Sequence, residues 1–145
     1  MLNLTNEQTG ALFQFRCRRM APQRAEKRLA HWRSVVESAC EQSGRARVPS
    51  LAAPAALEAA ARGLQDDGLR LLLDPQGEHR LAAMSAPASM QVVVAIGPEG
   101  GWSPRDREVL HAAGFSGLRL GPRVLRTETA GLAAIAALQA RMGDL

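Results

Sequence analysis

The sequence predicts an α/β fold in which a mainly parallel sheet is flanked by helices. Three observations favour it. Short apolar runs alternate with helical patterns along the chain. The run Val92–Ile96 is rich in β-branched residues, which is typical of a strand buried on both faces. Tight loops containing glycine and proline follow the apolar runs. With 145 residues, 46% of them hydrophobic, the chain is expected to form one domain.

The N-terminal part is least regular at its start. The first 20 or so residues fit neither a helix nor a strand strongly. From Arg24 to Ser43 the apolar residues recur at helical spacing, and Gly44 is the expected C-cap. The stripe consists of Leu29, Trp32, Val35, Val36 and Ala39. We interpret Trp32 as a core residue rather than as a residue that stacks on a base.

The middle of the chain contains a short helix and a strand. Pro54–Gly63 has proline near its start and glycine at its end, which predicts a helix. Gly68–Leu73 predicts a strand that ends in the turn Asp74-Pro75-Gln76-Gly77. Ser85–Met90 consists of small residues and methionine and is expected to be a linker.

The strand predicted at Val92–Ile96 leads directly into Gly97-Pro98-Glu99-Gly100-Gly101. A segment with three glycines and a proline is a loop, and its missing side chains let backbone groups approach a ligand closely. A helix is then predicted from Ser103-Pro104, with Ser103 as N-cap, Asp106 at the capping-box position and Gly114 as its end.

The C-terminal part repeats this order of strand, tight loop and helix. Gly117–Leu120 is the predicted strand, and the loop Gly121–Thr129 follows it. A helix of small apolar residues is predicted over Ala130–Met142. Because that helix is apolar nearly all round, we expect it to be buried in the core or against a second subunit.

Charge is unevenly distributed along the chain. The formal net charge is +4, and residues 1–50 hold nine Lys and Arg against four Asp and Glu, whereas residues 51–145 hold nine against ten. The basic half is therefore the better face for a polyanion. Aromatic residues make up only 3% of the chain, which disfavours the base-stacking surfaces of single-strand binders.

Cysteine and histidine usage argues against a metal site. Cys17 and Cys40 form no C-x-x-C pair, and His31, His79 and His111 are scattered. We expect neither zinc nor a disulfide, and a reducing cytoplasmic location. The sequence shows no signal peptide and no run of 18 apolar residues, so no membrane association is expected.

Two motifs at the C-terminal end carry a family resemblance. GPEGG at 97–101, a helix, and LG-x-x-VLRTETA at 120–130 resemble the small-subunit ribosomal RNA uridine-N3 methyltransferases of the SPOUT superfamily. Residues 41–49 also match the segment E-Q-S-x-R-x-x-V-P of that family. The resemblance implies a SPOUT methyltransferase domain over residues 24–145, with a trefoil knot in its C-terminal chain. Residues 1–23 match poorly, and by this resemblance we expect the chain to lack the family's N-terminal PUA-like domain and the start of its knotted domain.

The resemblance implies S-adenosyl-L-methionine as cofactor, no metal, a homodimer, and 16S ribosomal RNA of the small ribosomal subunit as partner. The cofactor is expected on backbone groups of three loops, the first around Leu73–Pro75. The expected cofactor residues are Leu73, Ile96, Gly97, Pro98, Glu99, Gly100, Gly101, Leu120, Gly121, Val124, Leu125, Thr129 and Ala130. The expected RNA-binding residues are Glu41, Gln42, Arg45, Arg47 and Arg123.

The implied reaction is methylation of N3 of a uridine, which requires loss of the N3 proton. We assign stabilisation of the resulting anion to Arg126, and the role of base, or of orienting Arg126, to Glu128. Glu128 could equally stabilise the last helix through its N-terminal dipole. Two other functions are kept open: a catalytically silent knotted domain that binds RNA or a partner chain, and an RNA ribose 2′-O-methyltransferase.

Overall fold

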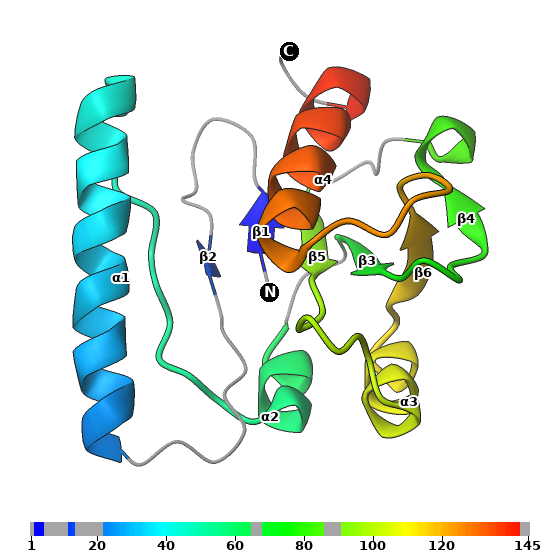
Figure 1. The fold of residues 1–145 in the computed structure, drawn as a ribbon, viewed down its shortest axis with the longest axis horizontal. Coiled ribbons are helices and arrows are strands. Elements are labelled where there is room, and N and C mark those ends of the chain that lie inside the picture. The colour runs from blue at the N-terminus through cyan, green and yellow to red at the C-terminus, as the bar shows by residue number, and fades with distance from the viewer. Residues whose placement is uncertain (1, 5–11, 14–21, 65–67, 86–90, 143–145) are drawn as a thin grey trace.

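The computed structural model describes residues 2–4, 12–13, 22–64, 68–85 and 91–142. The strands are β1 (Leu2–Leu4), β2 (Leu12–Phe13), β3 (Leu69–Leu73), β4 (His79–Arg80), β5 (Val92–Ala95) and β6 (Ser116–Arg119). The helices are α1 (Pro22–Ser43), α2 (Leu57–Arg62), the 3₁₀ turn η1 (Leu81–Ala83), α3 (Pro104–Ala112) and α4 (Thr127–Met142). Figure 1 shows their arrangement.

The described strands form one sheet in the order β2-β1-β5-β3-β6-β4. β5, β3, β6 and β4 are parallel to one another, whereas β1 pairs antiparallel with both β5 and β2. In the centre of the sheet Leu71 of β3 lies between Val94 of β5 and Ser116 of β6. The predicted α/β fold with a mainly parallel sheet is therefore confirmed, and β1 and β2 fall in the segment for which no regular structure was predicted.

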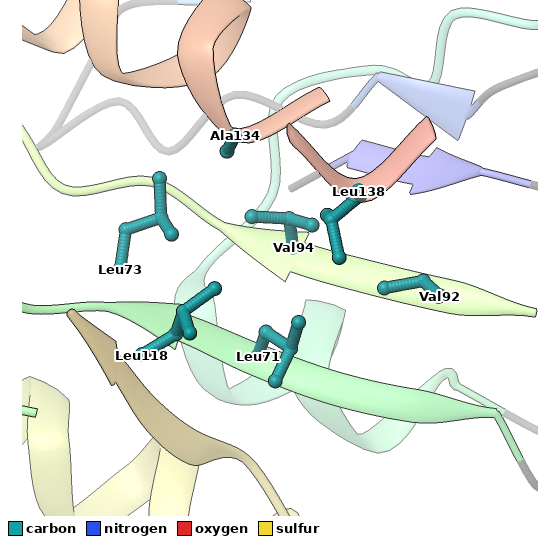
Figure 2. Packing of buried hydrophobic residues seen from close by; sticks show 7 residues of the cluster. All are labelled: Leu71, Leu73, Val92, Val94, Leu118, Ala134 and Leu138. Atoms are coloured by element: carbon teal, nitrogen blue, oxygen red, sulfur yellow. The ribbon is translucent and has the colours of Figure 1, made fainter. Parts of the chain in front are cut away.

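The sheet has a hydrophobic core on each face, because alternate residues of a strand point to opposite sides. Figure 2 shows one core, in which sheet residues meet Ala134 and Leu138 of α4. On the other face Leu72, Val93 and Ala95 pack with Leu57 of α2 and Leu110 of α3. β3 and β5 are therefore covered on both sides, which explains their almost uninterrupted apolar sequence.

Local signals placed α3 well. The side chain of Ser103 accepts a hydrogen bond from the Asp106 N–H at 3.2 Å, and the Ser103 N–H donates to the Asp106 carboxylate at 3.3 Å. Pro104 is the first helical residue, and Gly114 follows the helix with a φ of 80°. Both the predicted capping box and the predicted end of the helix are confirmed.

Other predicted boundaries shifted. α4 begins at Thr127, three residues before the predicted Ala130, because the Ala130 N–H already donates to the Arg126 carbonyl at 2.7 Å. Helix α2 is shorter than the predicted Pro54–Gly63. β4 and η1 were not predicted, and most of the expected linker Ser85–Met90 lies outside the described residues.

Helix α1 forms as predicted, and Gly44 ends it with a φ of 70°. Its apolar stripe is not buried, however. Val35 is 53% exposed, and Trp32 is only half-buried, so the prediction that Trp32 is a core residue is wrong. The reason is the position of α1 at one end of the molecule, outside both core clusters (Figure 1).

Candidate functional site

Three loops surround a cavity of about 720 Å³ at the carboxyl ends of β3, β5 and β6. We call them the first loop (residues 73–77), the second loop (residues 96–102) and the third loop (residues 120–126). Ligands of open α/β sheets bind at this edge, where successive loops converge. The volume suits a small organic molecule of cofactor size.

The first loop is a tight turn built around Asp74. One carboxylate oxygen of Asp74 accepts the Gln76 N–H at 2.9 Å, and the Asp74 carbonyl accepts the Gly77 N–H at 2.9 Å. Gly77 is pressed against Gly117 of β6, so that a Cβ on Gly77 would lie 2.6 Å from the Gly117 carbonyl carbon. The turn predicted at 74–77 is confirmed, and it crosses β6 at a point where only glycine fits.

The second loop turns at its glycines and ends on a buried tryptophan. The Gly101 N–H donates to the Pro98 carbonyl at 2.8 Å, and Gly101 has a φ of 72°. A Cβ on Gly100 or Gly101 would meet no atom within 4 Å, so open space faces this backbone. Trp102 is 8% exposed, and its indole N–H donates to the Leu73 carbonyl of the first loop at 3.0 Å.

The third loop leads into α4, whose first turn returns to the second loop. The Thr127 hydroxyl donates to the Gly97 carbonyl at 3.0 Å. A Cβ on Gly131 would lie 3.1 Å from the Ile96 side chain, so α4 packs closely on the end of β5. Hydrogen bonds therefore join the second loop to the first loop and to the start of α4, which directly follows the third loop.

An ion pair between Asp74 and Arg107 forms part of the cavity lining. The Arg107 Nε of α3 donates to the Asp74 carboxylate at 2.6 Å, and the Arg107 Nη1 donates to the Trp102 carbonyl at 2.8 Å. The hydrogen bond between Arg107 and Asp74 lowers the pKa of Asp74, although burial acts in the opposite direction. The same hydrogen bond raises the pKa of Arg107. Asp74 is therefore an ionised carboxylate although it is only 6% exposed.

The structure gathers most of the predicted site residues around the cavity. Arg126 and Glu128, assigned to catalysis, line it, and so does Arg123, assigned to RNA. The predicted cofactor residues that line it are Leu73, Ile96, Gly97, Pro98, Glu99, Gly100, Gly101, Leu120, Gly121, Val124, Leu125 and Ala130. Thr129 does not line it and is exposed in the first turn of α4.

The other predicted RNA-binding residues lie elsewhere. Glu41, Gln42, Arg45 and Arg47 are exposed at and just after the C-terminal end of α1 and do not line the cavity. The Arg45 N–H donates to the Cys40 carbonyl at 2.9 Å, which fixes the chain as it leaves the helix. Cys40 is a buried free thiol, and Cys17 lies outside the described residues.

Sequence reasoning missed the side chains that hold the loops together. Asp74 was expected in a turn and in the first cofactor loop, with no role for its side chain, and Trp102, Arg107 and Thr127 were not singled out. A buried partner 33 positions away in sequence leaves no local pattern to read. A signal did exist for Trp102, because a large aromatic directly after a glycine loop is a candidate lid or anchor.

Within the described ranges, no group of three or more His, Cys, Asp or Glu side chains could hold a metal ion. No helix in that part of the chain has both the length and the apolarity needed to cross a bilayer.

A parallel sheet with a cavity at the carboxyl ends of its strands defines an α/β small-molecule-binding protein. Comparison with known proteins narrows this class. The family model for the RNA methyltransferase domain matches residues 9–139, so the chain belongs to that family.

The following similar proteins and solved structures are methyltransferases. The chain is similar to ribosomal RNA small subunit methyltransferase E of Buchnera aphidicola, with 35% identity over 82% of this chain and 48% of the relative. It is also similar to the Neisseria gonorrhoeae methyltransferase E solved with S-adenosyl methionine bound, with 39% identity, a TM-score of 0.82, and coverage of 91% and 54%. A Legionella pneumophila methyltransferase solved with the same cofactor matches at 37% identity and a TM-score of 0.81, over 92% and 55%. The chain thus spans about half the length of these relatives.

Proposed function

We propose that the chain binds S-adenosyl-L-methionine in the three-loop cavity and provides the methyl-transfer part of a methyltransferase acting on N3 of a uridine in 16S ribosomal RNA. The observation that carries the proposal is the cavity itself, in a chain of the RNA methyltransferase domain family. Three loops form the cavity, and the second of them is hydrogen-bonded to the first loop and to the start of α4. The cofactor-bound relatives, which have nearly the same fold, support it.

The cavity fits this cofactor in its chemistry as well as its size. No neighbouring side chain or backbone would meet a Cβ on Gly100 or Gly121, so backbone groups of these loops can approach adenine and ribose closely. Ile96, Leu120 and other apolar residues supply walls for the adenine ring. When bound, the cofactor supplies an electrophilic methyl group on a sulfonium.

The catalytic assignments rest on the first turn of α4. Arg126 and Glu128 flank Thr127, which is tied to the second loop, so both are held at the edge of the cavity. Arg126 stabilises the negative charge that develops on the uridine oxygens as N3 loses its proton. Glu128 accepts that proton or orients Arg126. As a carboxylate in the first helical turn, Glu128 also interacts favourably with the dipole of α4.

The same proposal covers partners and location. We propose that RNA contacts Arg123 at the cavity and Glu41, Gln42, Arg45 and Arg47 at the end of α1, that the small ribosomal subunit is the partner, and that the protein acts in the cytoplasm. A homodimer is proposed from α4, whose buried face meets the sheet while Leu132 is 72% exposed on another face. Val124 of the third loop is a second large apolar residue that is exposed, by 77%.

Calorimetry with S-adenosylhomocysteine tests the cofactor assignment. Gly100 lines the cavity, and a Cβ there would have open space around it, so Gly100→Val should abolish binding while the domain stays folded. Gly63→Ala at the end of α2, where a Cβ makes only ordinary contacts, is the control and should bind as the parent does. Equal affinity in Gly100→Val and the parent would mean that the second loop is only a turn.

Methylation of under-modified small subunits tests the reaction. The expected product carries the methyl group on N3 of one uridine in 16S ribosomal RNA. A methyl group on a ribose 2′ oxygen would replace the assignment with a 2′-O-methyltransferase. Binding of S-adenosylhomocysteine with no methylation of any RNA would support a silent cofactor-binding domain instead.

A further inference from the structure

Arg107 is the residue of α3 that lines the cavity, and its guanidinium donates hydrogen bonds to two different loops. Its Nε donates to the Asp74 carboxylate of the first loop, and its Nη1 donates to the Trp102 carbonyl at the end of the second loop. A planar guanidinium with fixed donors suits such a bridge, because each N–H has a defined direction. One side chain thereby sets the spacing of two loops.

Asp74 uses both carboxylate oxygens within the protein. One accepts from Arg107 at 2.6 Å, and the other accepts the Gln76 N–H at 2.9 Å. The side chain is 6% exposed, and a charge buried to this degree is tolerated only when it is paired and hydrogen-bonded. Asp74 therefore links α3, through Arg107, to the backbone of the first loop, through the Gln76 N–H.

Trp102 provides a second link between the second loop and the first loop. Its indole N–H donates to the Leu73 carbonyl, and its ring packs on Gly97, where an added Cβ would lie 3.1 Å from the indole nitrogen. Leu73 is bonded to Asp74 along the chain. The contacts Asp74–Arg107, Arg107–Trp102 and Trp102–Leu73 therefore form a closed ring that joins the first loop, the second loop and α3.

We propose that Asp74, Arg107 and Trp102 form a clamp of positioning residues that holds the first and second loops at the separation needed for the ligand. The inference rests on the proposed function, because it assigns these side chains a role in cofactor affinity. Each member of the clamp lines the cavity, so a displacement of the ring would change the shape of the cavity directly. An ion pair that served stability alone would leave the affinity of the folded protein unchanged.

The test compares four single variants with the parent. Arg107→Met keeps an unbranched apolar stem and removes the guanidinium group with its charge and its donors. Arg107→Lys keeps the charge and cannot bridge both partners. Trp102→Phe keeps an aromatic ring but removes the donor to Leu73 and part of the buried ring volume. The matched control is Arg105→Met, because Arg105 lies in the same helical turn and pairs in solvent with Glu108 at 3.4 Å, with 73% and 68% of the two side chains exposed.

The readout is the affinity for S-adenosylhomocysteine, measured by calorimetry on variants that remain folded. Arg107→Met should bind about tenfold more weakly or worse, as expected for loss of a charged hydrogen bond that shapes the site. Arg107→Lys and Trp102→Phe should fall between it and the parent, and the rise in Tm caused by saturating ligand should shrink in the same order. Arg105→Met should match the parent in both measurements. Parental affinity in a folded Arg107→Lys and Trp102→Phe would overturn the clamp.

Hydrogen exchange without ligand separates the clamp from the proposed function. The amides of Gln76, Gly77 and Gly101 should exchange faster in Arg107→Met or Arg107→Lys than in the parent, while amides of the buried part of α4 and those of Arg105→Met stay unchanged. Unchanged exchange at these three amides would overturn the clamp even if the ligand binds. A parent that binds no S-adenosylhomocysteine but shows the expected exchange pattern would overturn the proposed function and leave the clamp as a loop-fixing device.

Discussion

The charged side chains around the cavity fall into two physical classes. Asp74 is buried and has its hydrogen-bonding capacity taken up by protein partners. Arg123, Arg126 and Glu128 are exposed at the rim. The buried carboxylate of Asp74 suits a fixed structural task, whereas the exposed groups can exchange contacts with water for contacts with an incoming substrate. This division is why we assign catalysis to Arg126 and Glu128 and positioning to Asp74.

At the residue scale, the first prediction concerns Arg126. Arg126→Ala should reduce the rate of methyl transfer by about a hundredfold, as is typical when a donor to a developing oxyanion is lost. Affinity for S-adenosylhomocysteine should stay within about twofold, since the interaction strengthens only in the transition state. Single-turnover methylation of small subunits by the longest active form of the protein, with calorimetry alongside, measures both. A parental rate in Arg126→Ala would transfer the role to Glu128 or to a bound water.

The second residue-scale prediction follows from the lowered pKa of Asp74, caused first by its hydrogen bond to Arg107. Because the folded-state pKa lies below the ordinary value of 3.8, the pair stabilises the fold above about pH 4, and this stability is lost as the pH falls through the folded-state pKa. Asp74→Asn should therefore be less stable than the parent by about 2 kcal/mol at pH 7. The difference should shrink towards pH 2. Urea unfolding at several pH values measures it, and a difference that does not depend on pH would contradict the charge argument.

At the element scale, α3 is the support of the second loop. Its N-terminus begins directly after Trp102, and its capping box fixes the direction in which the chain leaves the loop. Ser103→Ala removes one half of that box and should destabilise the domain by about 1 kcal/mol. Ser43→Ala is the control, because the Ser43 hydroxyl bonds back to the Ala39 and Cys40 carbonyls of its own helix and caps no helix N-terminus. Thermal unfolding of the two variants measures the difference, and equal Tm values would show that the cap contributes nothing.

The elements also show how far sequence reasoning reaches. β5 and α3 were predictable because an apolar β-branched run and a capping box are local signals. β4 was not, since two exposed residues become a strand only by pairing with Leu118 and Arg119 far along the chain. The early start of α4 was missed because Thr127, Glu128 and Thr129 suit a loop or a first helical turn equally well.

The same distinction applies to the site. Its glycine-rich backbone could be expected from composition and resemblance, because glycine in a loop has a direct steric meaning. The clamp could not be, since Asp74, Trp102 and Arg107 acquire their roles only when β3 and α3 are brought together. The burial of α1 was predicted wrongly for a related reason: a helical apolar stripe shows that a face can be buried and does not show what buries it.

At the scale of the whole molecule, the cavity and the two arginines that follow α1 come from different parts of the sequence. The lining residues fall between Leu73 and Ala130, whereas Arg45 and Arg47 follow α1. Replacing both arginines with alanine should weaken RNA binding for all sequences and reduce the slope of log K against log salt by about one to two. Filter binding over a salt series measures this, with the exposed Arg62→Ala of α2 as control. An unchanged slope would remove Arg45 and Arg47 from the RNA surface.

The second prediction at this scale is a homodimer. Leu132 on α4 and Val124 on the third loop are large apolar residues exposed by 72% and 77%. Sedimentation at micromolar concentration should show a dimer, and Leu132→Glu should convert it to a folded monomer, because a charge would be buried in the contact. Val35→Glu, at a residue of α1 that is 53% exposed, should leave the dimer intact. A folded monomer of the parent at this concentration would contradict the proposal.

The crossing of Gly77 over Gly117 has an evolutionary consequence. A Cβ on Gly77 would lie 2.6 Å from backbone of Gly117, and one on Gly117 would lie 2.9 Å from the Gly77 Cα, so neither position can accept a side chain while the other stays in place. No replacement smaller than glycine exists, and a change at one position cannot be compensated at the other. Covariation between aligned sequences detects contacts through compensating changes. It should therefore find no coupling at this contact, although the shape of the first loop depends on it.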